Sequence, residues 1–225
     1  MTPNSAPPLT RIAAVFDVDR TLLPVTTTER LFIRYLFARR VLGPTTLLRT
    51  ALYLAVHAPR VGALEAMRRR RVYLAEQEVA RIKPLAARCY AEVIGPLIPA
   101  AARAAVTDHR AQGHLTVLLS GSLDFLLEPL QADLGADFLI ATHMEEQAGR
   151  FTGRIAGLWP YGPTKALLTR QFAEAHGVDF AASYAYADHH SDEEVLALVG
   201  HPVVISPQAK MQAIAARRGW PTRKF

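Results

Sequence analysis

The sequence predicts an α/β fold in which a doubly wound parallel sheet carries an inserted all-α segment. From residue 100 onwards, short apolar runs alternate with helical patterns, as expected for repeated βα units. One strand-like run precedes them, at residues 12–16. Between residues 27 and 93 the apolar residues recur only at helical spacing. One sheet, interrupted after its first strand by a helical insert of roughly 70 residues, accounts for these observations.

The first part of the chain is predicted to form one strand followed by four helices. Residues 12–16 are rich in β-branched and aromatic side chains, which is typical of a buried strand. Capping residues at positions 26–29 precede the first helix, and Gly43-Pro44 ends it. Residues 94–99 are predicted to be a hinge-like linker. The other three helices are predicted at residues 47–56 (ending near Pro59), 61–74 and 76–93.

The second part of the chain is predicted to alternate between the two kinds of element. Glycine follows three of the predicted helices, at positions where helices commonly end. The helices are predicted at residues 101–112, 123–134, 164–176, 192–199 and 208–218. The strands are predicted at residues 114–119, 137–141, 183–187 and 202–205, with a β-hairpin at residues 144–158.

The composition favours a globular, reduced protein. Half of the residues are hydrophobic, and the single cysteine, Cys89, allows no intrachain disulfide. We therefore expect a cytoplasmic location. No stretch reaches the roughly 18 uncharged apolar residues that span a bilayer, so no transmembrane segment is predicted. Residues 1–11 contain three prolines and no apolar core, and we expect a disordered tail rather than a signal peptide.

The positive charge is concentrated in the predicted helical insert. The chain has a net charge of +6, whereas residues 25–105 alone hold 14 Arg and Lys against 5 Asp and Glu. This stretch suits an anionic partner, namely a phosphorylated substrate, a lipid surface or nucleic acid, although arginines that merely solvate helices explain it equally well. It lacks the interleaved aromatic residues of single-strand binders, which argues against nucleic acid. Peripheral contact with a membrane stays open.

Four consecutive arginines, residues 68–71, stand out within this stretch. They span one helical turn and cannot share one face, but Val72, Tyr73 and Leu74 after them are expected to pack. We expect one or two of these arginines to contact a second anionic group on the substrate. The alternative is that all four are solvated.

Two carboxylates follow the first predicted strand. Asp17 and Asp19 are separated by one residue, so both side chains should leave the end of the strand on the same side. Two like charges at this distance are costly unless a cation or a shared proton compensates them. A hard cation such as Mg²⁺ is a common solution. The alternative is an ordinary turn, where Asp is frequent.

Polar residues also follow later strands and open later helices. Ser120 and Gly121, after the second strand, can present a hydroxyl and backbone N–H groups to a phosphate; the alternative is that Ser120 or Ser122 simply caps a helix. Lys165 lies at a helix N-terminus, where the helix dipole favours a nearby anion, but a solvated surface lysine is the alternative. Asp188 ends a strand, and Asp192 is either its functional partner or only a helix-opening acid.

Together these four stretches resemble the motifs of the haloacid dehalogenase superfamily. The Asp-Val-Asp-Arg-Thr sequence that begins at Asp17 resembles its first motif, and Ser120, Lys165 and the Asp188/Asp192 pair resemble the other three, in the same order. The usual Gly-Asp-Ser of the last motif is Ala-Asp-His here, at residues 187–189. The chain is most similar to the phosphoserine-phosphatase-like branch. The resemblance implies a Rossmann-like core domain at residues 1–24 and 98–225 and a helical cap domain at residues 25–97.

The resemblance also implies a mechanism. Asp17 would be the nucleophile that forms an aspartyl-phosphate, and Asp19 would be the general acid and base. Ser120, Gly121 and Lys165 would bind the phosphate. Mg²⁺ would be held by Asp17, Asp188, the backbone carbonyl of Asp19, and Asp192 as a ligand or an outer partner. The neighbouring His189 and His190 are interpreted as local variation, because no third neutral ligand for zinc is apparent.

The family resemblance implies a phosphatase acting on a small phosphorylated metabolite or a lipid phosphate. Phosphoserine phosphatases carry a Glu nine residues after the nucleophile, and Thr26 occupies that position here, which argues against phosphoserine. Related proteins suggest histidinol phosphate, sugar phosphates, and lysophospholipid or glycerolipid phosphates as other candidates. The alternative function is a binding module whose basic cap docks on an anionic membrane surface or nucleic acid while the core is weakly active or idle.

Overall fold

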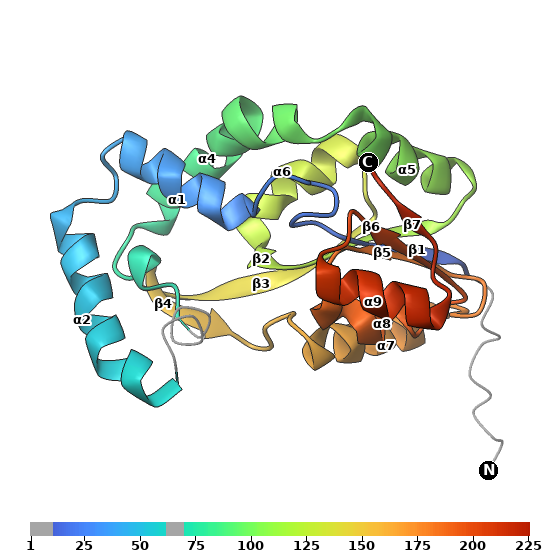
Figure 1. The fold of residues 1–225 in the computed structure, drawn as a ribbon. Helices are drawn as coiled ribbons and strands as arrows, with labels where there is room; N and C mark the ends of the chain where they lie inside the picture. Colours follow the sequence, from blue (N-terminus) through green and yellow to red (C-terminus); the bar gives the residue numbers. More distant parts are fainter. Residues whose placement is uncertain (1–10, 62–69) are drawn as a thin grey trace, which may run out of the picture.

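Seven strands form one sheet in the computed structural model, which describes residues 11–61 and 70–225 (Figure 1). The strand order is β4-β3-β2-β1-β5-β6-β7, and only β3 and β4 are antiparallel. The predicted doubly wound parallel sheet is therefore confirmed. The strands are β1 (Ala13–Asp17), β2 (Leu115–Leu123), β3 (Phe138–Gln147), β4 (Arg150–Ala156), β5 (Tyr184–Ala187), β6 (His201–Ile205) and β7 (Thr222–Arg223).

The central strand β1 is buried on both faces because its side chains alternate between two apolar cores. Ala14 and Phe16 join the core under α1 (Thr28–Ala38), α4 (Val79–Cys89), α5 (Ala100–Ala111) and α6 (Asp124–Leu134). Ala13 and Val15 join the core under α7 (Pro163–His176), α8 (Glu193–Leu196) and α9 (Ala209–Arg218). Figure 1 shows α4, α5 and α6 on one face of the sheet and α7, α8 and α9 on the other.

The segment between β1 and β2 is mainly helical where it is described. It holds α1, α2 (Pro44–Val61), the 3₁₀ turn η1 (Val72–Leu74) and α4, followed by the π-helical turn η2 (Tyr90–Ile94) and the 3₁₀ turn η3 (Gly95–Leu97). α1 and α4 pack on α6, whereas α2 lies beyond α1 at the far end of the molecule and contacts η1 (Figure 1). The division into a core at 1–24 and 98–225 and a cap at 25–97 remains a prediction.

The helix predicted at residues 61–74 is wrong in its described part. Arg70 pairs with Arg154 in an antiparallel bridge, and the Arg71 N–H donates to the carbonyl of Gly153 at 2.8 Å. Pairing with β4 thus holds this stretch extended before the short turn η1. Residues 62–69, including Arg68 and Arg69, lie outside the described residues. So do residues 1–10, where the disordered tail was predicted.

Other differences concern where elements end. β2 continues through residues 120–123, where the sequence indicated a turn, and β3 continues into the predicted hairpin as one strand. α2 extends past the expected end at Pro59, and the short strand β7 was not predicted. Within the described residues, no single helix is long and apolar enough to cross a membrane; residues 79–97 and 100–111 would pass only as a pair, and they meet at a bend of 100°.

Candidate active site

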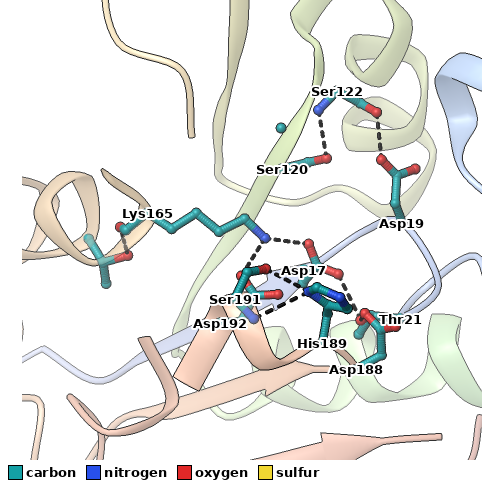
Figure 2. A network of polar contacts seen from close by, with 12 residues as sticks. Asp17, Asp19, Thr21, Ser120, Ser122, Lys165, Asp188, His189, Ser191 and Asp192 are labelled. Atoms are coloured by element: carbon teal, nitrogen blue, oxygen red, sulfur yellow. Dashed lines mark hydrogen bonds and ion pairs between the residues drawn. The ribbon is translucent and has the colours of Figure 1, made fainter. Parts of the chain in front are cut away.

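The polar residues identified from the sequence lie together at the C-terminal ends of neighbouring strands. Asp17 is the last residue of β1, and Asp188 directly follows β5, which is paired with β1. Ser120 lies in the last part of β2, on the other side of β1. Lys165 reaches the same place from the first turn of α7, as Figure 2 shows. Parallel strands bring their C-terminal ends to one edge, so residues far apart in the sequence meet here.

A tight loop after β1 orients the carboxylate of Asp17. The Leu23 N–H donates to the carbonyl of Val18 at 2.9 Å, and Arg20 adopts the left-handed conformation, with φ of 69°. This conformation is uncommon for a residue with a side chain and is typical of functional loops. The loop returns Thr21 to the strand end, where its hydroxyl donates to Oδ2 of Asp17 at 2.8 Å. Thr21 belongs to the Asp-Val-Asp-Arg-Thr motif, but no role was predicted for its side chain.

Lys165 forms buried ion pairs with two of the carboxylates. Its Nζ lies 2.6 Å from Oδ1 of Asp17 and 2.8 Å from Oδ1 of Asp192. Burial lowers the pKa of Lys165, but the charges of Asp17 and Asp192 outweigh this effect and raise its pKa above the ordinary value. Lys165 is therefore a permanent cation at the strand ends, and the alternative of a solvated surface lysine is wrong because the side chain is buried.

Three buried carboxylates form a cluster that fits a divalent cation. Oxygen atoms of Asp17, Asp188 and Asp192 lie within 4.8 Å of one another. Burial, followed by the charges of Asp17 and Asp192, raises the pKa of Asp188 to about 7, and burial also raises the pKa of Asp17. One lysine cannot neutralise three carboxylates at this depth. The oxygen donors and the excess negative charge match the preferences of Mg²⁺.

Asp19 is held apart from this cluster. Figure 2 shows its carboxylate turned toward Ser122 and away from Asp17. The Ser122 hydroxyl donates to Oδ2 of Asp19 at 2.5 Å, and the N–H of Thr28 donates to Oδ1 at 2.7 Å. Burial nevertheless raises the pKa of Asp19, which favours a carboxyl group that can carry a proton. A metal contact of Asp19 through its backbone carbonyl remains a prediction.

Ser120 and Gly121 lie within β2 beside the carboxylates, rather than capping a helix. The Ser120 hydroxyl is buried and accepts a hydrogen bond from the N–H of Ser122 at 3.1 Å. The Gly121 carbonyl accepts bonds from the Thr142 hydroxyl at 2.7 Å and from Nε1 of Trp159 at 3.2 Å. A Cβ atom at position 121 would lie 3.1 Å from that nitrogen, so a larger residue here would require the Trp159 side chain to shift by a few tenths of an ångström. Their predicted contacts with a phosphate remain predictions.

The residues around this site also test two secondary interpretations. The imidazole of His189 accepts from the N–H of Ser191 at 3.2 Å, and burial beside His190 lowers the pKa of His189 to about 4. The candidate metal cluster within the described residues contains no histidine, and the interpretation of His189 and His190 as local variation remains a prediction. Arg71, from the four-arginine run, lies 2.7 Å from Oε1 of Glu29, so its charge is already paired.

A single large cavity joins these side chains to the helices of the insert. Its volume is about 1090 Å³, and it contains all six of the predicted catalytic, serine and metal-binding side chains together with Gly121. Parts of α1, α2 and η1 complete its wall. The site is therefore a deep cavity between the strand ends and the helical insert, which is a common arrangement for small-molecule enzymes.

Comparison with models of protein families shows which family the chain belongs to. The family model of haloacid dehalogenase-like hydrolases matches residues 14–197. The chain belongs to this family. The matched range begins in β1 and ends after Asp192, so it includes every residue of the site described above.

Relatives of known name are consistent with this result. A Streptomyces azureus protein named for inhibition of morphological differentiation is 32% identical over 222 residues, which covers 96% of this chain and 79% of the relative. A probable phosphatase of Mycobacterium tuberculosis is 29% identical and covers 100% of this chain and 79% of its own. A phosphoserine phosphatase of the same organism is 31% identical, with coverage of 95% and 70%.

Solved structures give the same fold. A protein of unknown function from Bordetella pertussis Tohama I has a TM-score of 0.81 and 28% identity, and the alignment covers 95% of this chain and 98% of that one. A phosphoserine phosphatase solved as a phospho-aspartyl intermediate analogue has a TM-score of 0.63, with 91% and 90% coverage. Its identity is only 16%, so this likeness concerns the fold alone. The chain is thus similar in fold to the phosphoserine-phosphatase-like branch.

Proposed function

We propose that this hydrolase is a Mg²⁺-dependent phosphatase that cleaves a phosphate monoester through an aspartyl-phosphate on Asp17. The observation that carries the proposal is the contact of Asp17 with Lys165, 2.6 Å long, beside two further buried carboxylates. This arrangement provides a nucleophile, a fixed cation for the phosphate oxygens and oxygen ligands for a metal. The names of two relatives, a probable phosphatase and a phosphoserine phosphatase, support the same reaction.

In the first half-reaction, a carboxylate oxygen of Asp17 attacks phosphorus while the bond to the alcohol oxygen breaks. Lys165 and the Ser120 hydroxyl would bind the equatorial phosphate oxygens, where negative charge is concentrated. Mg²⁺, held by Asp17, Asp188 and Asp192, would supply positive charge that offsets the repulsion between these carboxylates and the phosphate. Asp19 would give its proton to the departing alkoxide, and its raised pKa suits that task.

In the second half-reaction, water attacks the phosphorus atom of the aspartyl-phosphate. Asp19, which has lost its proton, would take one from this water, and inorganic phosphate would leave as the Asp17 carboxylate is restored. The bonds from Ser122 and Thr28 hold the Asp19 carboxyl group close to one position through both steps. The alternative of a binding module with an idle core lacks support, because the side chains proposed for catalysis line one cavity.

Hydrolysis of p-nitrophenyl phosphate with and without Mg²⁺ tests the proposal. We expect activity with Mg²⁺ that is lost on chelation, and Asp17→Asn should reduce turnover more than about a hundredfold because it removes the nucleophile. Asp108→Asn is the matched control, since Asp108 is an exposed residue of α5. Retention of more than about a hundredth of the activity in Asp17→Asn would exclude the covalent mechanism.

A further inference from the structure

The cavity is much larger than a phosphate group requires. Its volume of about 1090 Å³ exceeds that of most pockets for drug-sized ligands, which measure roughly 300–1,000 Å³. The phosphate site around Asp17 and Lys165 occupies only one end. The remainder extends along α1 and reaches α2, which Figure 1 shows at the far end of the molecule. The space beyond the phosphate is therefore available to the alcohol part of the substrate.

The wall around this remaining space is largely apolar. Trp159 and Tyr161 are stacked, with ring centroids 4.6 Å apart, and form a flat aromatic surface beside β2. Further apolar or aromatic side chains come from the helical insert: Ile33, Phe37, Leu47, Tyr53, Val72 and Tyr73. Contact with such a wall is favourable for hydrocarbon and gives little to a small polar alcohol.

The acidic group nearest this wall is already engaged. Glu29 lies 2.7 Å from Nε of Arg71, and the Tyr73 hydroxyl donates to Glu29 at 3.0 Å. A substrate amine that bound Glu29 would have to break this largely buried pair with Arg71. Among the described residues of the cavity, the other carboxylates are Asp17, Asp19, Asp188 and Asp192, all at the phosphate end.

The apolar wall also continues to the surface. Leu47 and Phe37 line the cavity but are 55% and 38% exposed. Arg30 and Arg34 are exposed residues of α1 that line the cavity too, so the opening attracts the phosphate end of a ligand. An apolar wall with a basic opening matches an amphiphilic phosphate.

We propose that the substrates are phosphate monoesters whose alcohol carries an extended apolar chain. The phosphate would lie at Asp17 and Lys165, and the chain would run along α1 and α2 past Phe37 and Leu47. This inference rests on the proposed phosphatase function and adds the chemical class of its substrate. It also makes Leu47 a residue that determines specificity.

A chain-length series of substrates tests the inference. Phosphate release is measured from ethyl, hexyl and decyl phosphate, each below its micellar concentration. We expect kcat/KM to rise at least about tenfold from the ethyl to the decyl ester. Equal or falling values along the series would overturn the substrate class while leaving the phosphatase function intact.

Two neighbouring residues on α2 provide matched variants. Leu47→Glu places a charge in the cavity wall, whereas Leu48→Glu places one beside it, at a residue that is 61% exposed and does not line the cavity. The ratio of kcat/KM for decyl phosphate to that for ethyl phosphate should fall about tenfold in Leu47→Glu and stay unchanged in Leu48→Glu. An equal effect of both variants, or none, would overturn the placement of the chain.

Binding of phosphonates separates the two proposals. Decylphosphonate and ethylphosphonate cannot be hydrolysed, and calorimetric titration in the presence of Mg²⁺ gives their Kd values directly. We expect decylphosphonate to bind at least about tenfold more tightly. This result without hydrolysis of any ester would refute the phosphatase function but keep the ligand class. Equal Kd values would refute the ligand class whatever the activity.

Discussion

Thr28 holds one carboxylate oxygen of Asp19 with two donors, its backbone N–H at 2.7 Å and its hydroxyl at 2.9 Å. Because Thr28 is the first residue of α1, these bonds tie the predicted acid and base to the start of the helical insert. The Ser122 hydroxyl holds the other oxygen from β2. Asp19 is thereby fixed between the sheet and the insert, so its position depends on both.

The substitution Asp19→Asn should slow both half-reactions. An amide neither donates a proton to the alkoxide nor takes one from water, and such acid–base assistance is worth roughly 10²–10⁴-fold. Rapid-mixing measurement of p-nitrophenol release resolves the initial burst from the steady state. A burst of normal rate followed by normal turnover would remove Asp19 from this role.

Replacement of Lys165 by Met should affect both activity and stability. Loss of the cation that faces the phosphate should lower kcat/KM by roughly 10²–10³-fold. The buried carboxylates would also lose their partner, at a cost of about 3–5 kcal/mol, and Mg²⁺ should restore part of that loss. Enzyme assays and urea unfolding with and without Mg²⁺ measure the two effects. Lys210→Met, at an exposed lysine of α9, is the control, and equal behaviour of the two variants would contradict the expectation.

The pair of Glu29 and Arg71 should behave as a coupled unit in stability. Arg71→Met and Glu29→Gln each leave one largely buried charge without its partner, and each should lower the free energy of unfolding by about 3 kcal/mol. The double variant should lose less than the sum of the two. Urea unfolding of the four proteins completes the cycle. Additive losses would show that the two side chains do not interact.

Part of the loss of folding stability at low pH should come from His109. Burial, followed by the charge of His114, lowers the pKa of His109 to about 4, while Nε2 of His109 lies 2.8 Å from the Tyr186 hydroxyl. Since its ordinary pKa is 6.5, the unfolded chain binds a proton that the folded chain excludes between pH 6.5 and 4. Stability contributed by neutral His109 is thus present above pH 6.5 and is lost as the pH falls, by about 1–2 kcal/mol at pH 5.

Comparison with His109→Gln isolates this contribution. The variant keeps a hydrogen-bonding side chain that does not titrate, so its loss of unfolding free energy between pH 7 and pH 5 should be smaller than that of the wild-type protein. If the two proteins lose the same amount, His109 does not govern this transition.

Local sequence patterns were sufficient for the strands that carry the site. The apolar runs before Asp17 and Asp188 predicted β1 and β5, and the family resemblance implied that the two acids would share a metal ion. Residues Ser120-Gly121-Ser122 were wrongly predicted to form a turn, because their composition is typical of one. In the fold, Leu123 pairs with Thr142 after a shift in register, and this pairing keeps residues 120–122 in the strand. Strand pairing between distant segments decided the outcome, and no local pattern contains it.

The partners of the functional side chains were not predictable in the same way. Ser122 and Thr28 bind Asp19 from positions 103 and 9 residues away, and their hydroxyls carry no local signature of that role. Likewise, the helix predicted at residues 61–74 rested on the helical spacing of apolar residues in that stretch. Contacts with β4 and with Glu29 determine the conformation of Arg70 and Arg71 instead. These interactions depend on the assembled fold.

Because β1 lies in the middle of the sheet, its pairing with neighbouring strands is completed late in synthesis. The Ala13 N–H donates to the Ser183 hydroxyl, 170 residues further on, and β5 follows directly. At 5–20 residues per second, a ribosome needs roughly 10–30 s to supply that partner. The helices after β1 rely on local contacts and can form within this interval, whereas one edge of β1 remains open to pairing with other chains. A chain released before β5 is made would keep Asp17 at the end of a strand with an open edge, so premature termination favours aggregation over partial activity.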